Sequence, residues 1–349
     1  MNTYIEGAGG CIVTKSLLNG ETQLKWIFRE ESVNSVDNGW IAFGGGDSQE
    51  YVDNSKNLAV VDFNTLANIE PAVLNILYMP VGTDLEFVSD DTGRYFIETA
   101  TGREIRGKVK SPFQIVFEKN LQFLREDNYP PEFLRSLFEP SEALEQFIMG
   151  EVDLPSGEVV IADPMAYLHD KDYAVPLNKT VNAGAYPVEL SILRSPAAGI
   201  RIAAARLIFS NRASLRYEIA MPKGKTIEQL NDPGVLAGFG VDAGLACFCD
   251  SLAARQYETF LRQWYGDDKE KNHYDDYFAE LFAESYKTSP ANQREGGDFI
   301  IWNMPSSGIR MAMFSSGMGD GFYTGLWGMD ESGKLCELVI PFMNPEIFI

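Results

Sequence analysis

Short apolar runs separated by turn signals dominate the first ninety residues. Alternating or compact apolar stretches predict strands at Cys11–Thr14, Leu24–Phe28, Trp40–Phe43 and Leu85–Val88, and either a strand or a short helix start at Asn57–Asp62. Asp37-Asn38-Gly39 and Gly44-Gly45-Gly46 are turn signals. Apolar residues at helical spacing predict a helix over Asn68–Met79. Residues 1–93 are therefore expected to form a small α+β module.

The next segment, residues 94–149, has a different pattern. Tyr95–Ile97 with Ile105 indicates either a hairpin or a connector. From Phe113 to Phe147 the apolar spacing becomes helical and is interrupted by prolines. We therefore predict two or three helices that bridge the modules.

Strand patterns return in residues 150–349. They predict strands at Glu158–Ala162, Tyr186–Leu193, Ile200–Phe209, Leu215–Met221, Phe299–Trp302, Ile309–Phe314, Phe322–Trp327 and Leu335–Ile340. Asp250 is placed to cap a helix that ends at Gly266, and Tyr274–Tyr286 predicts a second, aromatic-rich helix. Because strands and helices do not alternate, the pattern favours a mainly antiparallel, β-rich α+β domain. The expected fold class of the whole chain is α+β.

Charge changes the picture of possible partners. The chain of 349 residues has a net charge of −21, of which residues 1–93 carry −10, residues 94–149 carry −1 and residues 150–349 carry −10. Binding to nucleic acid or to an anionic membrane relies on Lys and Arg, so both are excluded as expected partners. The acidic first module favours a basic partner.

The cysteines and the hydropathy profile indicate a cytoplasmic protein. Cys11, Cys247, Cys249 and Cys336 make no disulfide framework and fit reduced thiols. The sequence shows neither a secretory signal nor an apolar run long enough to span a membrane.

Several stretches of the first module resemble immunity-protein family 33 over about residues 8–90. They are Cys11–Leu17, Lys25–Glu31, Asp37–Trp40, Phe43–Gly45, Met79–Gly82 and Leu85–Phe87. This resemblance implies a protein that protects against a secreted toxin by binding it.

A second set of motifs resembles the domain-of-unknown-function 4241 family over about residues 150–342. They are Gly157–Pro164, Gly184–Pro187, Gly240–Gly244, Cys247–Asp250, Gly319–Tyr323 and Trp327-Gly328. This resemblance implies no established chemistry.

Four aspartates are candidate ligands for a hard metal ion, since each lies beside a turn or an element boundary: Asp163, Asp242, Asp250 and Asp320. The same residues also fit ordinary structural roles, because Asp250 is a good N-cap and Asp163 and Asp320 precede Pro and Gly. The Cys247–Cys249 pair has no second Cys or His pair beside it, so we interpret it as two buried thiols rather than a zinc site. No cofactor is predicted.

The candidate partner-binding residues belong to the first module. They combine aromatic and charged side chains of types that are common at interfaces: Trp26, Arg29, Glu30, Glu31 and Trp40. The alternative interpretation places both tryptophans in the small core and Arg29 in an ion pair within the module. The acidic Tyr274–Tyr286 helix could imitate a nucleic-acid surface toward a basic toxin, although such a pattern is also typical of a solvated helix face.

The sequence thus favours an immunity-type binding protein that neutralises a cognate, basic bacterial toxin by direct binding. Two alternatives stay open: a carboxylate- or metal-dependent hydrolase in the C-terminal domain, and a structural or regulatory interaction protein unrelated to toxins.

Overall fold

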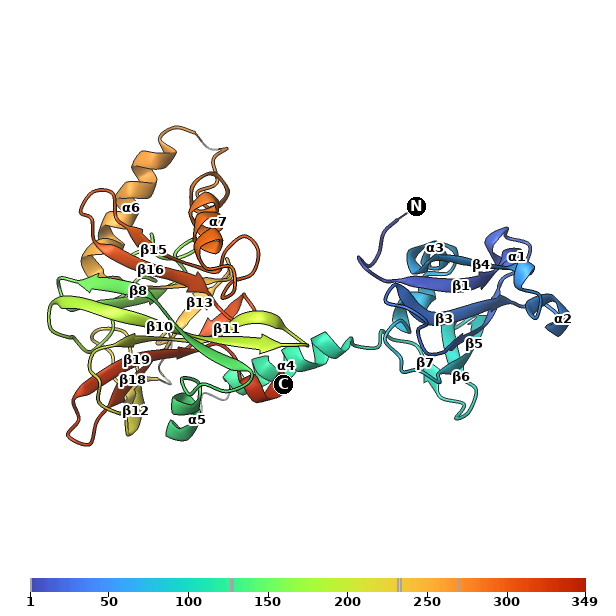
Figure 1. The fold of residues 1–349 in the computed structure, drawn as a ribbon, viewed down its shortest axis with the longest axis horizontal. Helices are drawn as coiled ribbons and strands as arrows, with labels where there is room; N and C mark the ends of the chain where they lie inside the picture. The colour runs from blue at the N-terminus through green and yellow to red at the C-terminus, as the bar shows by residue number, and fades with distance from the viewer. Residues whose placement is uncertain (1, 126–128, 231, 233, 269) are drawn as a thin grey trace. The chain divides into compact units, whose positions relative to one another are not determined.

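Two compact units make up the chain. The computed structural model describes residues 2–125, 129–230, 232, 234–268 and 270–349. The smaller unit comprises Met1–Gln114 and the larger unit Ile115–Ile349 (Figure 1). The α+β fold class predicted from the sequence is confirmed, with sheets that are antiparallel except for one parallel pair, β1 with β3.

The smaller unit is a seven-stranded sheet with short helices. Its elements are β1 (Gly10–Thr14), α1 (Lys15–Leu18), β2 (Leu24–Arg29), β3 (Asp37–Gly44), α2 (Gln49–Val52), η1 (Ser55–Asn57), β4 (Leu58–Asp62), α3 (Phe63–Ile69), η2 (Pro71–Asn75), β5 (Asp84–Asp90), β6 (Gly93–Glu98) and β7 (Glu104–Ile105). The strand order is β4-β1-β3-β2-β5-β6-β7. The four strands predicted in this region are confirmed, and Asn57–Asp62, for which a strand or a short helix start was expected, is mainly strand.

One face of this sheet carries the core of the smaller unit. Along β3, Trp40 and Ala42 are buried while Ile41 and Phe43 are partly exposed, which is the period of two expected for a sheet with one covered face. The covering residues come from α3 and η2: Phe63, Leu66, Ala67, Ala72 and Val73.

The helix predicted over Asn68–Met79 is wrong in its bounds. The α-helix lies earlier, at Phe63–Ile69, with the Asp62 side chain accepting a hydrogen bond from the backbone N–H of Asn64 as its N-cap. Glu70 is extended because it precedes Pro71, so the chain breaks there and continues as a 3-10 turn. The apolar spacing was correct about burial but could not show where the proline divides the helix.

The larger unit has more strands and longer helices, and the first of these helices, α4, begins in the last three residues of the smaller unit. Its elements are α4 (Pro112–Arg125), α5 (Pro131–Ser136), β8 (Leu144–Leu154), β9 (Val159–Ala162), β10 (Gly184–Ser195), β11 (Gly199–Ile208), β12 (Arg216–Ile219), η3 (Ile227–Gln229), β13 (Phe239–Val241), β14 (Leu245–Asp250), α6 (Ser251–Tyr265), η4 (Tyr274–Phe278), α7 (Ala279–Thr288), β15 (Phe299–Asn303), β16 (Arg310–Ser315), β17 (Gly321–Tyr323), β18 (Leu326–Met329), β19 (Leu335–Pro341) and η5 (Pro345–Ile347). They form a six-stranded sheet (β12-β18-β19-β11-β10-β8), a four-stranded sheet (β15-β16-β14-β9) and the pair β13-β17.

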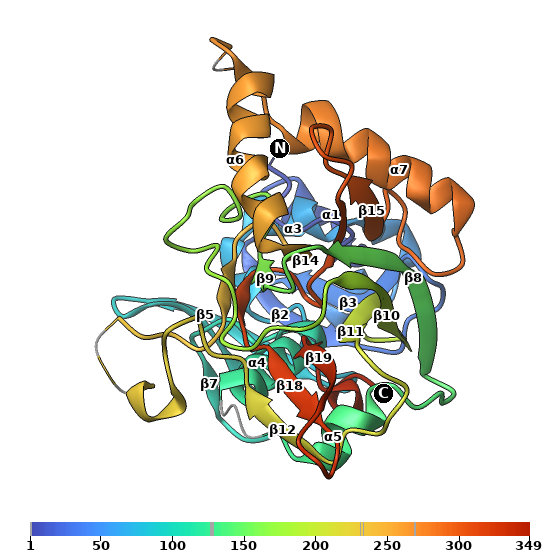
Figure 2. The same ribbon diagram turned by 90° about the vertical axis from the view of Figure 1, so that its left-hand side faces the viewer.

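The four-stranded sheet is buried on both faces. In β14, Ala246 and Phe248 join the core shared with the six-stranded sheet, while Cys247 and Cys249 join the core formed with the helices. Figure 2 shows α6 and α7 at the same end of the larger unit, close to β14 and β15. The larger unit is therefore layered as sheet, sheet and helices.

Residues 94–149, predicted as a helical bridge, differ from that description. β6 and β7 pair with the strands before them and extend the sheet of the smaller unit, as in the hairpin alternative. At the other end, Leu144 begins β8, which pairs with β10 of the larger unit. Two helices, α4 and α5, do lie between these strands. Short strands carry too few positions for their pattern to separate them from a connector.

Among the residues that the structure describes, no helix has the length and apolar character needed to cross a bilayer.

Candidate partner-binding face

The face of the seven-stranded sheet opposite its core is also apolar. Strand pairing places Ile12 beside Val60 and Ile41, Phe28 beside Ile41, and Trp26 beside Phe43. Partners in a register share one side of a sheet, so these side chains form one continuous band. We call this band the outer face, defined by Ile12, Trp26, Phe28, Ile41, Phe43 and Val60.

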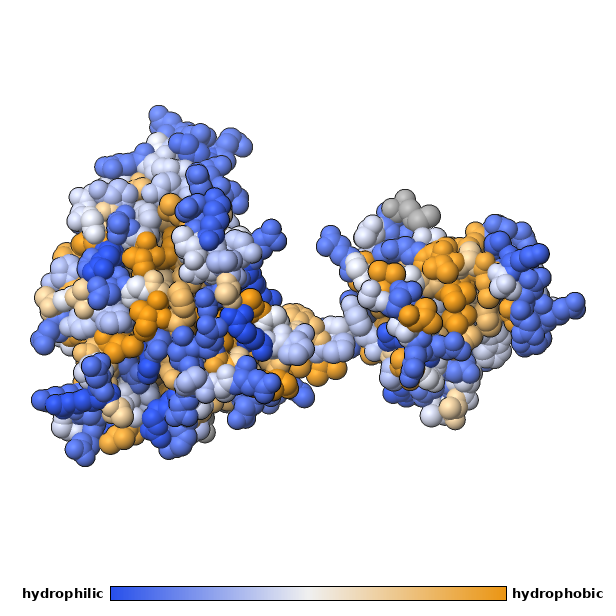
Figure 3. Space-filling view, viewed as in Figure 1, coloured by the Kyte–Doolittle hydropathy of each residue, from blue (hydrophilic) through white to orange (hydrophobic). Residues whose placement is uncertain are grey.

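The outer face is accessible. Trp26 is 40% exposed and Val60 is 78% exposed, and the other members are partly exposed. Phe28 and Phe43 meet edge to face, with ring centroids 5.4 Å apart. In Figure 3 apolar residues gather on the smaller unit over β1 and β3. Soluble monomers rarely expose large contiguous apolar patches, and a patch of this kind commonly marks an interaction site.

Carboxylates border the outer face on β5. Asp84 pairs with Phe28 and Glu86 pairs with Trp26, so both acids lie on the same side of the sheet as the aromatic rings. The Lys25 ammonium is 2.5 Å from a Glu86 oxygen and 5.8 Å from the centroid of the Trp26 ring. The Lys25 ammonium therefore partly compensates the charge of Glu86, whereas no described cation forms an ion pair with Asp84.

The candidate partner-binding residues divide between the surface and the interior. Trp26, Glu30 and Glu31 are exposed. Trp40 is completely buried, and its indole N–H donates to the Leu77 carbonyl at 3.1 Å. Trp26, Glu30 and Glu31 are therefore free to contact a partner, whereas Trp40 is not.

Arg29 has a structural role in place of the ion pair expected in the alternative interpretation. Its guanidinium donates to the carbonyls of Asn38, Leu77 and Met79, the first at 2.9 Å. Burial lowers the pKa of Arg29 from its usual value. Next to it, Gly39 has φ 78°, and a Cβ there would lie 2.1 Å from the Glu30 carbonyl oxygen, so the Asn-Gly-Trp motif needs its glycine.

The sequence interpretation missed most of the outer face. Ile12, Phe28, Ile41, Phe43 and Val60 were not singled out as functional candidates. The sequence did indicate this face, because Leu24–Phe28 and Trp40–Phe43 carry apolar residues at both odd and even positions of the strand. Odd and even positions of a strand point to opposite faces of the sheet. If helices cover only one face, one of the two apolar sets must face outward.

The four candidate metal ligands do not assemble into a metal site. Asp163 is buried, and its two oxygens accept backbone N–H groups of Met165 and Ala166 on one loop and of Asp242 and Ala243 on another. Burial raises the pKa of Asp163, against the lowering effect of these four bonds. Within the described residues, no group of three or more His, Cys, Asp or Glu side chains could hold a metal ion.

The other aspartates are separately engaged. Asp250 is buried and caps α6 by accepting from Leu252 N–H at 2.8 Å, and it also accepts from the backbone and hydroxyl of Ser156. Asp242 accepts a hydrogen bond from the Tyr167 hydroxyl. Asp320 is exposed in the turn before β17. These carboxylates join loops and helix ends.

The cysteines and His273 also lie in structural positions. All four cysteines are buried and free, and burial raises the pKa of Cys11 to about 12. The His273 imidazole lies between the Met165 carbonyl, 3.1 Å from Nε2, and the Tyr265 hydroxyl, 2.6 Å from Nδ1. Since a carbonyl only accepts, Nε2 carries the proton and Nδ1 accepts from Tyr265. Burial lowers the pKa of His273.

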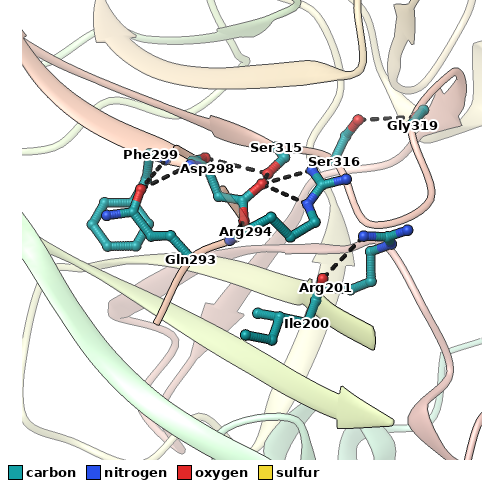
Figure 4. Close-up of polar contacts among 9 residues, drawn as sticks. All are labelled: Ile200, Arg201, Gln293, Arg294, Asp298, Phe299, Ser315, Ser316 and Gly319. Atoms are coloured by element: carbon teal, nitrogen blue, oxygen red, sulfur yellow. Dashed lines mark hydrogen bonds and ion pairs between the residues drawn. The ribbon is translucent and has the colours of Figure 1, made fainter. Parts of the chain in front are cut away.

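A polar cluster of the larger unit contains one unsatisfied group (Figure 4). The buried Asp298 carboxylate accepts two bonds from the Arg294 guanidinium and one from the Ser315 hydroxyl. Arg201 lies beside this pair, and its Nη1 donates to the Ile200 carbonyl at 3.1 Å. The Nε of Arg201 is buried without a hydrogen-bond partner. The pKa of Arg201 is lowered mainly by burial and, to a smaller extent, by the nearby charge of Arg294.

Comparison with known proteins assigns the two parts of the chain to different families. Residues 152–340 match the family described as a protein of unknown function, DUF4241, and this match covers more than half of the chain. Residues 11–98 match the immunity protein Imm33 domain, which contains every residue of the outer face. Neither a curated protein nor a solved structure matches the chain. Both resemblances expected from the sequence are confirmed.

Proposed function

This chain belongs to the DUF4241 family and carries an Imm33 domain, and from these two facts we propose that it is an immunity-type protein that neutralises a bacterial toxin by direct binding. The outer face of the Imm33 domain is the proposed contact surface. The observation that carries the proposal is the accessible apolar band on the face of the sheet opposite its core, within the very residues that match an immunity domain.

The composition of the outer face supports a protein partner. Aromatic side chains such as Trp26, Phe28 and Phe43 remove a large area from water at a small cost in side-chain entropy, and they are enriched at interface hot spots. We therefore expect Trp26 and Phe43, which are register partners, to supply the centre of the interface.

Charge supports a basic toxin as the partner. Residues 1–93, all of which lie in the smaller unit, carry a net charge of −10, and Glu30, Glu31 and Asp84 are exposed on this unit. Such a surface raises the rate of association with a cation-rich partner, and added salt lowers that rate. The proposed mechanism needs no cofactor, and the proposed site of action is the cytoplasm, where the four free thiols would stay reduced.

Co-expression tests the proposal. The full chain is immobilised, binding proteins are identified by mass spectrometry, and each basic candidate is expressed with and without the chain in a bacterial host. We expect growth to stop with the candidate alone and to be restored by the wild-type chain. Restoration should fail with the Trp26→Thr/Phe43→Thr variant, because Thr keeps the strand propensity and removes the aromatic area.

A matched control separates the outer face from general stickiness. Ile69 is an exposed apolar residue at the end of α3, the helix that covers the other face of the sheet. The Ile69→Thr variant should protect as well as the wild type. Full protection by the Trp26→Thr/Phe43→Thr variant, or the absence of any toxic binding protein, would contradict the proposal and favour a toxin-unrelated interaction protein.

A further inference from the structure

The larger unit contains a cavity that the proposed toxin binding does not use. Its volume is about 440 Å³, within the range of small-molecule sites. The floor consists of apolar residues that are almost completely buried, from strands and loops far apart in the sequence: Ile161, Ala162, Leu177, Ala220 and Phe239. An apolar floor of this kind stabilises a ligand through the apolar area that it removes from water.

Large apolar side chains also stand at the rim. Tyr173 is 60% exposed, Leu236 61% and Phe322 44%, and all three line the same cavity. Tyr173 stacks on Tyr167, with ring centroids 4.9 Å apart and planes 30° from parallel. Flat rings on the walls favour a flat ring in the ligand, since offset stacking adds to the burial of area.

The walls of the cavity are fixed before any ligand binds. The hydroxyl of Tyr167 donates to Asp242, and the buried Asp163 accepts backbone N–H groups from the loops that carry these two residues. At Gly240 a Cβ would lie 3.4 Å from the Tyr167 ring, so the absence of a side chain lets the ring approach the strand closely. These aspartates, which the sequence suggested as metal ligands, therefore hold one wall of the cavity in place.

The second wall is fixed by strand pairing. β13 pairs with β17 in the register Phe239↔Tyr323 and Gly240↔Phe322. The backbone hydrogen bonds of this pair therefore hold the floor residue Phe239 and the rim residue Phe322 in fixed positions. A preformed site loses little conformational entropy when it binds.

The charged lining residues define the polar end of the ligand. They are Lys223, Lys225 and Asp172. Lys223 is already paired with Glu158, whereas no described carboxylate lies within ion-pair distance of the exposed Lys225. In a chain of net charge −21, a lining with two lysines and one aspartate is locally cation-rich.

We propose that this cavity binds a small planar aromatic carboxylate, with the ring between the Tyr173 and Phe322 walls and the carboxylate directed to Lys225. Asp172 opposes the ligand charge and lowers the affinity.

Three naphthalene probes test the proposal on the full chain. 2-Naphthoate, 2-naphthamide and 2-naphthylmethylammonium share one ring and differ in charge, and isothermal titration calorimetry gives each Kd. We expect 2-naphthoate to bind most tightly, roughly two- to fivefold tighter than the amide, as one partly solvated ion pair provides. Unsaturable binding of 2-naphthoate, or equal affinity for the three probes, would overturn the proposal.

Variants locate the binding. Lys225→Glu should remove the preference for 2-naphthoate, and Asp172→Asn should increase it. The control is Lys334→Glu, a charge reversal in the exposed turn before β19, which should change none of the three affinities. Phe322→Ala should weaken the binding of all three probes, because it removes an aromatic side chain from the lining. Trp26→Thr should leave every affinity unchanged. An equal effect of Lys225→Glu and Lys334→Glu, or a loss of binding in Trp26→Thr, would place the probe elsewhere and contradict the assignment.

Discussion

Two neighbouring arginines of the larger unit make opposite contributions to stability. Arg294 neutralises the buried Asp298, whereas Arg201 is a half-buried cation whose Nε has no partner. A half-buried cation with an unsatisfied donor carries a desolvation cost that lowers the free energy of unfolding, and loss of one member of a buried pair lowers it further.

Replacement of each arginine by methionine measures this difference. Arg201→Met should leave the free energy of unfolding unchanged or raise it by up to about 1 kcal/mol. Arg294→Met should lower it by about 2 kcal/mol, because the carboxylate of Asp298 loses its cation while staying buried. Urea unfolding followed by tryptophan fluorescence gives both values. Equal losses in the two variants would contradict the distinction.

His273 should make stability depend on pH. Its pKa in the folded protein is lowered from 6.5, so below about pH 6.5 the unfolded chain binds a proton that the folded chain does not. The free energy of unfolding should therefore fall as the pH drops from 6.5 toward the lowered pKa. In His273→Gln this part of the decrease should be absent. Parallel pH profiles for His273→Gln and the wild type would show that the imidazole does not contribute.

Among the secondary-structure elements, most strands were predicted from the sequence, but the layers and strands that pack against each of them were not. The runs Leu24–Phe28 and Ile309–Phe314 are compact and apolar, and both are strands as expected. β14 was not predicted, because all six of its residues are buried between two layers and show no alternation. Local spacing also could not reveal that Phe28 and Ile41 become neighbours, since their pairing depends on the register of the sheet.

The candidate carboxylates show the same limit. Asp250 was recognised as an N-cap from its position before an amphipathic run, and the structure confirms this. The role of Asp163 depends on N–H groups of residues 242 and 243, far along the chain, which the sequence alone cannot bring together.

Asp163 should therefore hold two loops together. In Asp163→Ala the four N–H groups of Met165, Ala166, Asp242 and Ala243 lose their acceptor, and we expect a decrease of about 2–4 kcal/mol in the free energy of unfolding. Hydrogen exchange should accelerate at those amides more than at the centre of β10. Unchanged protection at Asp242 and Ala243 would show that other contacts fix these loops.

At the scale of the whole molecule, each unit has its own core. The smaller unit buries residues such as Trp40, Phe63 and Phe96 in one cluster, and the two large clusters of the larger unit lie on either side of its four-stranded sheet. A unit with its own core can fold independently. A fragment of residues 1–110 should give dispersed amide resonances and a cooperative unfolding transition. A disordered spectrum would show that the fragment needs the rest of the chain.

The outer face of the Imm33 domain is the surface through which we propose that the chain binds a protein partner. The most direct measurement is the Kd of the purified partner for the wild-type chain, the Trp26→Thr/Phe43→Thr variant and the Ile69→Thr control, by titration calorimetry. Loss of two central aromatic residues should weaken binding by roughly thirtyfold or more, with no change in the control. A double variant that binds as tightly as the wild type would contradict the claim.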